Sequence, residues 1–155
     1  MSISQWEVKT FQQLTVQQLY DVLRLRVDVF VVEQQCAYRE LDGYDQHPET
    51  RHLSGRNEGG ELIAYARILP PGISDSEVNL GRFVVKAESR KQGIGHQLIQ
   101  TALQEISTCW PEMPIKMSAQ SHLHRFYAQY GFMQVSDGYL EDGIPHVEMV
   151  KDASV

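Results

Sequence analysis

A glycine turn is encoded by the stretch Ser89-Arg90-Lys91-Gln92-Gly93-Ile94-Gly95-His96-Gln97-Leu98. An apolar run typical of a strand, Phe83 to Val85, leads into it, and apolar residues at helical spacing follow it. Two glycines one residue apart let a ligand approach the backbone closely, and the N–H groups at a helix start attract anions. The stretch therefore predicts an anion cradle between a strand and a helix.

The charges beside the glycines narrow the choice of anion. Arg90 and Lys91 suit a pyrophosphate better than a single carboxylate. A Rossmann fingerprint needs a third small residue where Leu98 stands, and a P-loop needs a Gly-Lys-Ser/Thr sequence that the chain lacks, so nucleotide binding of either type is disfavoured. A glycine turn that only opens a surface helix remains the structural alternative.

The composition is that of one ordinary globular domain, which we assign to residues 1–155. A formal net charge of -6 argues against nucleic-acid binding. Cys36 and Cys109 form no zinc or disulfide motif, and reduced thiols in a cytoplasm are the expectation. The sequence shows neither a signal-peptide pattern nor a long apolar run, so we expect neither export nor a membrane-spanning helix. His122 and His124 lack the spacing for a shared metal, so no metal is expected.

The first half of the chain predicts a strand, a helix, a loop and a hairpin. A weak alternation of apolar and polar residues predicts a strand within residues 1–10. A capping box at Thr15 begins a helix whose expected apolar face comprises Val16, Leu19, Leu23, Val27 and Phe30. The acidic segment from Glu40 to Asp45 is either a functional loop or a solvated connection. The strands of the hairpin span residues 51–55 and 61–69.

The second half predicts strands and helices around the glycine turn. Residues 78–85 form the central strand, and the helix after the turn buries Ile94, Leu98, Ile99, Ala102, Leu103 and Ile106. A short strand follows at residues 115–119. Ser121 is placed to cap a helix with an aromatic stripe, and Gly131 to end it in the left-handed conformation. Residues 133–150 predict two strands with a turn at Asp142-Gly143.

Two motifs in this order resemble those of the GNAT acyltransferase superfamily. Arg90-x-x-Gly93-x-Gly95 is similar to its pyrophosphate-binding motif, and Phe126-Tyr127-Ala128-Gln129-Tyr130-Gly131-Phe132 to its aromatic signature beside the thioester. The segments 29–34, Cys36-x-Tyr38, Asp42-x-x-Asp45 and 141–146 resemble the ElaA-like branch. The resemblance implies an α/β (α+β) fold, with a mixed, mostly antiparallel twisted sheet flanked by helices on both faces.

The resemblance also implies an acetyl-CoA-dependent N-acetyltransferase, which moves an acetyl or other short acyl group from acyl-CoA to a primary amine by direct attack in a ternary complex. Backbone N–H groups of the central strand would stabilise the thioester oxygen. Gln120 stands where the superfamily usually has an asparagine. The residues expected to bind acetyl-CoA are Phe83, Val84, Val85, Arg90, Lys91, Gln92, Gly93, Ile94, Gly95, His96, Gln120 and Phe126.

For catalysis the resemblance implies that Tyr127 donates a proton to the departing thiolate. The glutamate that the superfamily often uses as a base has no match in residues 79–82. Glu33, His52 and His146 are the candidate bases, and a structural role is open for each. The missing glutamate also motivates a different hypothesis, a non-catalytic acyl-CoA-binding regulatory module.

The acceptor is expected to be a small-molecule or peptide amine that carries positive charge. It would enter between the segments 33–45 and 141–146, where clustered carboxylates raise the local concentration of a cation. The sequence leaves the acceptor's identity, the acyl length and the oligomeric state open, with a homodimer among the options. The carboxylates are those of Glu40, Asp42, Asp45, Glu141 and Asp142.

Overall fold

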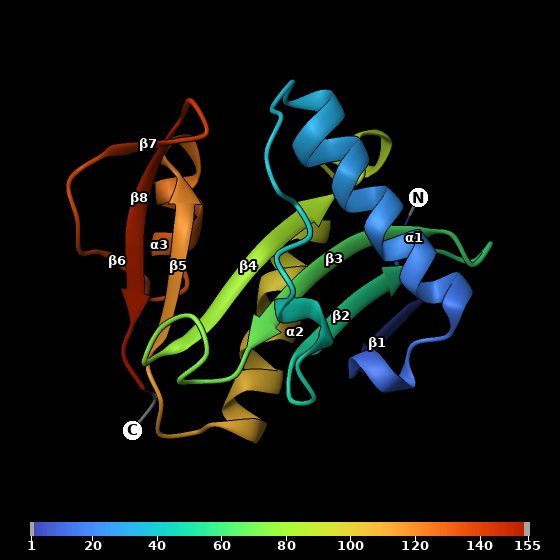
Figure 1. Ribbon diagram of the computed structural model, residues 1–155, viewed down its shortest axis with the longest axis horizontal. Helices are drawn as coiled ribbons and strands as arrows, with labels where there is room; N and C mark the ends of the chain where they lie inside the picture. The colour runs from blue at the N-terminus through green and yellow to red at the C-terminus, as the bar shows by residue number, and fades with distance from the viewer. Residues whose placement is uncertain (1, 154–155) are drawn as a thin grey trace.

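The computed structural model describes residues 2–153 and contains one mixed sheet of eight strands (Figure 1). The strand order is β1-β2-β3-β4-β5-β8-β6, and β7 pairs with β8. Every pairing is antiparallel except that of β4 with β5. The strands are β1 (Gln5–Lys9), β2 (Arg51–Arg56), β3 (Leu62–Leu69), β4 (Val78–Val85), β5 (Ile115–Gln120), β6 (Met133–Gln134), β7 (Tyr139–Glu141) and β8 (Ile144–Lys151).

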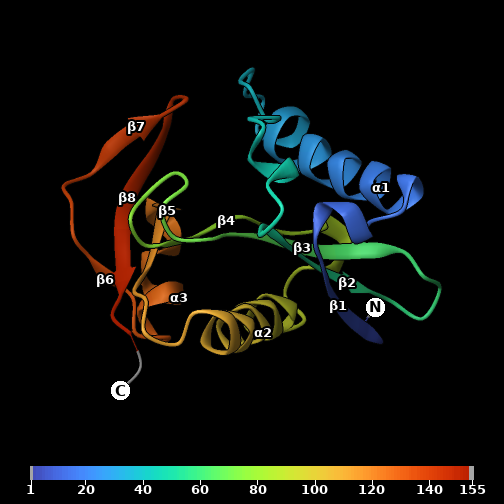
Figure 2. The same ribbon diagram turned by 60° about the horizontal axis from the view of Figure 1, so that its bottom comes forward.

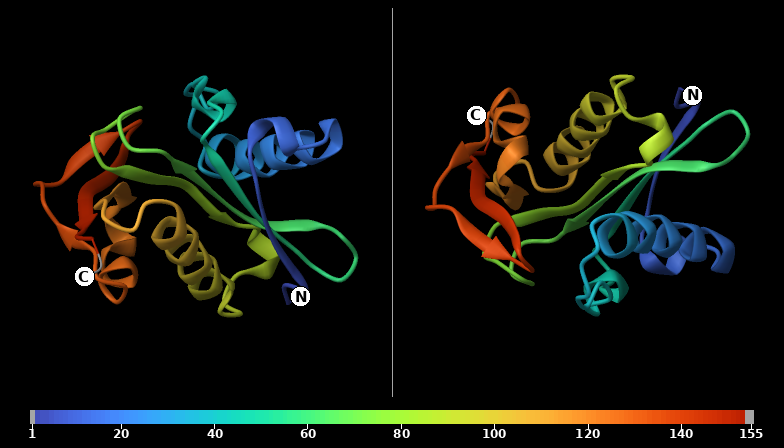
Figure 3. Two further views of the ribbon diagram at one scale, coloured as in Figure 1. Left: turned by 90° about the horizontal axis from the view of Figure 1, so that it is seen from below. Right: turned by 90° about the horizontal axis from the view of Figure 1, so that it is seen from above.

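Helices cover both faces of this sheet. Helix α1 (Val16–Arg26) lies on one face, and α2 (Ile94–Cys109) and α3 (His124–Ala128) lie on the other (Figures 2 and 3). A large apolar cluster fills the α2 and α3 side, and a smaller one, which includes Val22, Leu25 and Tyr65, fills the α1 side. The predicted fold class is thus confirmed. Within residues 2–153, no helix combines the length and apolarity that a membrane crossing requires.

Helix α1 begins where its sequence indicates but buries a different face. The Thr15 hydroxyl accepts a hydrogen bond from the Gln18 N–H, and the Gln18 side-chain oxygen accepts one from the Thr15 N–H. The expected apolar face was wrong, because Val16 is 88% exposed while Val22, Leu25 and Val29 are buried. This helix carries apolar residues on several sides, so spacing alone could not select the face that packs.

After Arg26 the helix widens into a π-helical segment, Val27–Glu33. π-Helical turns are rare and are found mostly at functional sites. Here the segment carries Phe30 and Glu33 to the region between β4 and β5.

Strand β4 contains a bulge that divides it into two parts. Tyr65 of β3 pairs with Val84 and Arg67 pairs with Gly81, so two residues of β4, Arg82 and Phe83, stand opposite one. Arg82 has a φ of 50°, an unusual value for a residue other than glycine.

Strands β4 and β5 separate along their length. They pair only through Val78 with Ile115 and Asn79 with Lys116, and then diverge, as Figure 1 shows. The sheet therefore opens beyond Asn79, beside the bulge of β4.

The C-terminal part differs in detail from the sequence prediction. A 3-10 turn occupies Ser121–Leu123 and α3 begins only at His124, so Ser121 does not cap the helix as predicted. The left-handed Gly131, with a φ of 93°, is confirmed. Three strands rather than two follow it, with β7 and β8 joined by the predicted turn at Asp142-Gly143.

Candidate active site

A cleft of about 860 Å³ occupies the opening between β4 and β5. Its walls also include the π-helical segment and the loop after it, the glycine turn, α3 with the 3-10 turn before it, and the β7–β8 hairpin. The cleft thus joins the glycine turn to the aromatic motif and lies between the segments 33–45 and 141–146. All the residues expected to bind acetyl-CoA line it except Gln92.

The glycine turn has the backbone geometry that an anion cradle needs. Lys91 and Gly93 have positive φ values of 66° and 78°, and α2 begins at Ile94, so N–H groups of its first turn have no partner within the helix. A Cβ added at Gly93 would meet no protein atom within 4 Å. The turn therefore fits a pyrophosphate such as that of CoA, which would rest against Gly93 and the start of α2.

Arg90 is already engaged by Glu33 at the rim of the cleft. Its guanidinium donates two hydrogen bonds to the Glu33 carboxylate, at 2.7 and 3.1 Å, and its Nε donates to the Val85 carbonyl. The bonds from Arg90 lower the pKa of Glu33. A carboxylate held in this way is a weaker base than a free one, which disfavours Glu33 as the general base.

The aromatic helix brings a phenol into the cleft. The Tyr127 ring packs edge-on against Phe83, Phe126 and Phe132, which fixes its position. The residue is 4% exposed, and burial raises the pKa of its hydroxyl, which therefore stays protonated at neutral pH. No described residue forms a hydrogen bond with this hydroxyl. Tyr127 thus offers an uncommitted proton to the cleft.

His146 presents the lone pair of one nitrogen. Its Nδ1 lies 2.7 Å from the Ile144 carbonyl oxygen, and because a carbonyl only accepts, Nδ1 carries the hydrogen. In the neutral ring Nε2 is then an acceptor, and the Glu141 carboxylate stands 3.4 Å from it. Two acceptors side by side suit a cationic amine that donates to both.

Tyr127 and His146 belong to opposite faces of the sheet. Tyr127 lies in the apolar cluster on the α2 and α3 side, together with Val147 of β8. Successive side chains of a strand alternate, so His146 points to the α1 side, where it shares a face with its partner Gln120. A molecule between β4 and β5 would meet these two residues from opposite directions.

The position of His52, away from the cleft, disfavours it as the general base. His52 is 1% exposed and does not line the cleft. Its Nδ1 lies 2.7 Å from the Tyr65 hydroxyl and its Nε2 3.0 Å from the Asp45 carbonyl, so Nε2–H donates and Nδ1 accepts. Burial lowers the pKa of His52, which keeps the ring neutral. The residue is part of the interior.

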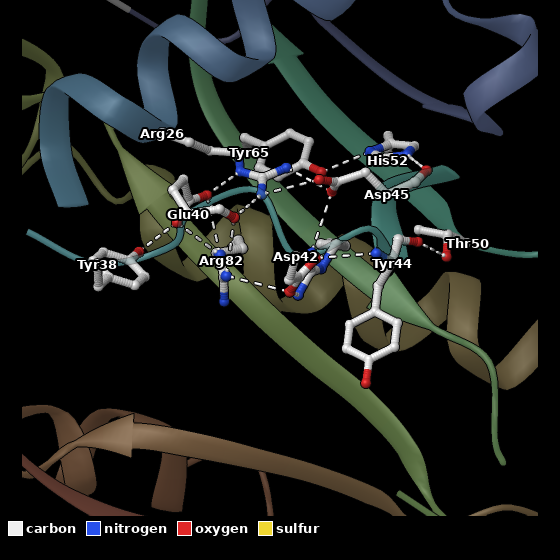
Figure 4. A network of polar contacts seen from close by, with 11 residues as sticks. Arg26, Tyr38, Glu40, Asp42, Tyr44, Asp45, Thr50, His52, Tyr65 and Arg82 are labelled. Carbon is white, nitrogen blue, oxygen red and sulfur yellow. Dashed lines mark hydrogen bonds and ion pairs between the residues drawn. The ribbon is translucent and has the colours of Figure 1, made fainter. Parts of the chain in front are cut away.

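Three of the five carboxylates expected to attract a cation are also used internally. Glu40, Asp42 and Asp45 pair with Arg26, Arg67 and Arg82, and we call these six residues the ionic network. All of them except Arg67 are labelled in Figure 4. The segment that carries the acids is therefore neither a solvated connection nor a free acidic patch. Only Glu141 and Asp142 remain at the cleft wall.

The ionic network is buried and densely bonded. Arg26 is 0% exposed and donates to Glu40 and to Asp45, the latter at 2.7 Å. Arg67 holds Asp42 through two bonds of 2.9 Å. Burial alone would lower the pKa of Arg26, but Tyr65, Asp45 and Glu40 outweigh it and raise the pKa. Arg26 therefore stays charged.

The sequence prediction missed three residues that line the cleft. Cys36, Tyr38 and Arg82 line it, and the Tyr38 hydroxyl donates to Glu40. A signal for the network was present, because Arg26 follows Val22 by four positions on the face that packs. An arginine on an apolar face indicates a buried acidic partner.

Comparison with known proteins agrees with this arrangement. A family model described as an acetyltransferase (GNAT) domain matches residues 8–153. Protein ElaA of Escherichia coli is 41% identical over 149 residues, 96% of each chain, and a UPF0039 protein of Schizosaccharomyces pombe is 43% identical over 153 residues, 96% of this chain and 97% of that one.

Solved structures show the same architecture. An acyl-CoA N-acyltransferase from Pseudomonas aeruginosa superposes with a TM-score of 0.91 at 44% identity, over 97% of this chain and 99% of that one. The shared fold includes the mixed sheet and the helices on both of its faces. On its sequence and its fold, the chain belongs to the GNAT acetyltransferase family, in the ElaA-like branch.

Proposed function

We propose that the protein transfers an acetyl or other short acyl group from acyl-CoA to a primary amine, by direct attack in a ternary complex. One observation carries this proposal: the anion cradle and the uncommitted Tyr127 hydroxyl line the same cleft. Both cysteines are free thiols, which suits the cytoplasm as the expected location.

Acyl-CoA supplies an acyl group that is activated as a thioester. His146 would take a proton from the amine at Nε2, because an ammonium has no lone pair for attack. As nitrogen bonds to the carbonyl carbon, backbone N–H groups between Phe83 and Val85 would stabilise the charge that develops on oxygen. When the carbon–sulfur bond breaks, Tyr127 would give its proton to the sulfur. The second proton, which the attacking nitrogen loses as the amide forms, would restore the phenol.

The proposed acceptor is a cationic amine that enters between the segments 33–45 and 141–146. The support for a cation is now narrower than the sequence indicated. It consists of Glu141 and Asp142 at the wall and of the adjacent acceptor atoms of His146 and Glu141. A low ionic strength should favour such an acceptor.

A non-catalytic acyl-CoA-binding module is the second candidate. It is favoured by the absence of a carboxylate on residues 79–82 of β4, which line the cleft in part. Such a module would bind acyl-CoA without consuming it.

Thiol release from acetyl-CoA in the presence of an amine panel separates the two functions. Transfer predicts release that depends on the amine and an acylated product of matching mass. Binding of acetyl-CoA without release for any amine would support the regulatory module instead.

A further inference from the structure

Arg82 occupies an unusual position in the cleft. It stands in the bulge of β4, directly before Phe83, and its backbone has a φ of 50°. Strained backbone of this kind persists only where the surroundings impose it, and it is often found at ligand-binding sites. The side chain of Arg82 lines the cleft, on the wall formed by β4.

The guanidinium of Arg82 is held on two of its three nitrogens. Nε lies 2.9 Å from the Glu40 carboxylate, and Nη2 donates to the Glu40 carbonyl and to Asp42. The Tyr38 ring lies beside it, 5.9 Å from its central carbon. The third nitrogen, Nη1, has no partner among the described residues, and no dashed line reaches it in Figure 4.

The carboxylates that hold Arg82 are shared with other donors. Glu40 also accepts from Arg26 and Tyr38, and Asp42 accepts two shorter bonds from Arg67. Both carboxylates that Arg82 contacts are therefore shared, and Arg82 has no carboxylate to itself. It is fixed in place and still has donor capacity at Nη1.

The opposite wall has the complementary chemistry. Glu141 and His146 offer acceptor atoms there, which suit the ammonium of a substrate. A donor fixed on one wall and acceptors on the other match a molecule with an amine at one end and an anionic oxygen group at the other.

We propose that Arg82 Nη1 binds a carboxylate of the acceptor, so that the substrate is an amino carboxylate rather than a simple amine. This inference rests on the proposed function and specifies its acceptor. The ionic network then serves to hold the arginine in one orientation before the substrate arrives, which limits the entropy lost on binding.

Matched pairs of acceptors test this proposal. Each amino acid is compared with the amine left by removing its carboxylate: glycine with methylamine, β-alanine with ethylamine, and lysine with cadaverine. The wild-type protein should favour the amino acid in kcat/KM, for the best pair by about tenfold or more, the size of one charge-assisted hydrogen bond. The preference should appear chiefly in the KM for the acceptor.

The variant Arg82→Met keeps the length of the side chain and removes its donors. In this variant the ratio of kcat/KM for the amino acid to kcat/KM for the matching amine should approach one. The control Arg24→Met removes an exposed arginine of α1, outside the cleft, and should keep the wild-type ratio. Urea unfolding of both variants establishes that they are folded.

Two results would overturn the assignment. One is equal use of both members of every pair by the wild-type protein, and the other is an equal loss for both members in Arg82→Met, which would indicate a purely structural arginine. Calorimetry can measure how tightly each amino acid and its matching amine bind to the complex of the protein with CoA. The same preference for the amino acid, and its dependence on Arg82, is then tested without turnover. A binding preference that depends on Arg82, without thiol release, would keep this site and refute acyl transfer.

Discussion

Two polar regions flank strand β4, and they use their charged groups differently. In the ionic network, Arg26, Arg67 and three carboxylates bind one another in the interior. In the cleft, the Tyr127 hydroxyl and the Lys91 ammonium have no partner among residues 2–153. Polar groups that bind one another stabilise the fold, whereas those left without partners are free to bind a substrate. Mutations in the two regions should therefore affect different quantities.

The largest effect is expected from breaking the ionic network. Arg26→Met would leave Glu40 and Asp45 buried without their main counter-charge, which should lower the free energy of unfolding by about 3–5 kcal/mol. Urea denaturation measures this loss, with Arg24→Met, an exposed arginine of the same helix, as the control. A loss below about 1 kcal/mol would mean that the network does not stabilise the fold.

The next effect concerns the cradle. Gly93→Val should weaken acetyl-CoA binding by at least about a hundredfold, because several backbone hydrogen bonds to the pyrophosphate are lost together. Gly60→Val is a matched control, since Gly60 also has a positive φ, of 81°, and open space around it, but lies in the β2–β3 turn. Calorimetry compares the two. Similar affinities in both variants would contradict the cradle assignment.

A pair of tyrosines separates the regions most directly. Tyr127→Phe should lower kcat about a hundredfold and change stability little, because the hydroxyl has no partner to lose. Tyr65→Phe removes a buried hydroxyl that binds His52 and should cost about 1 kcal/mol of stability. Both kcat and the free energy of unfolding are measured on both variants. A loss of stability with unchanged kcat in Tyr127→Phe would show that Tyr127 is a packing residue.

The smallest effect is a gradual pH dependence from His52. Its pKa is lowered in the folded protein, so the unfolded chain binds more protons near and below the unfolded pKa of 6.5. The stability that the neutral ring contributes is present above pH 6.5 and is lost as the pH falls below it. Between pH 8 and pH 5, the urea midpoint of His52→Gln should decline less steeply than that of the wild-type protein. Parallel curves would indicate that His52 titrates normally.

The sequence predicted the elements that local patterns determine. The capping box at Thr15, the turn at Asp142-Gly143 and the buried face of α2 depend on residues close together in the chain. All three are confirmed, except that Leu103 of α2 is only partly buried. The GNAT family was predicted from two motifs and is shown by the comparisons. The roles of the individual site residues remain predictions.

What the sequence could not give was the pairing of distant charges. Glu40 and Arg82 are 42 positions apart, and neither residue type reveals that the fold brings them together. The acids of the segment 40–45 therefore looked available to a substrate. The pKa of an ordinary histidine, near neutrality, makes His52 a candidate base, whereas its burial against Tyr65 depends on how β2 and β3 pack with that segment.

The opening between β4 and β5 also has a mechanical consequence. Two residue pairs, Val78 with Ile115 and Asn79 with Lys116, join the two halves of the sheet at one end, and the other ends of β4 and β5 are not paired with each other. A molecule that touches both walls ties the free ends together. Amide hydrogen exchange in β5 and β8 should then slow when acyl-CoA binds, although most of these amides lie outside the cradle, because opening of the C-terminal half now requires release of the ligand.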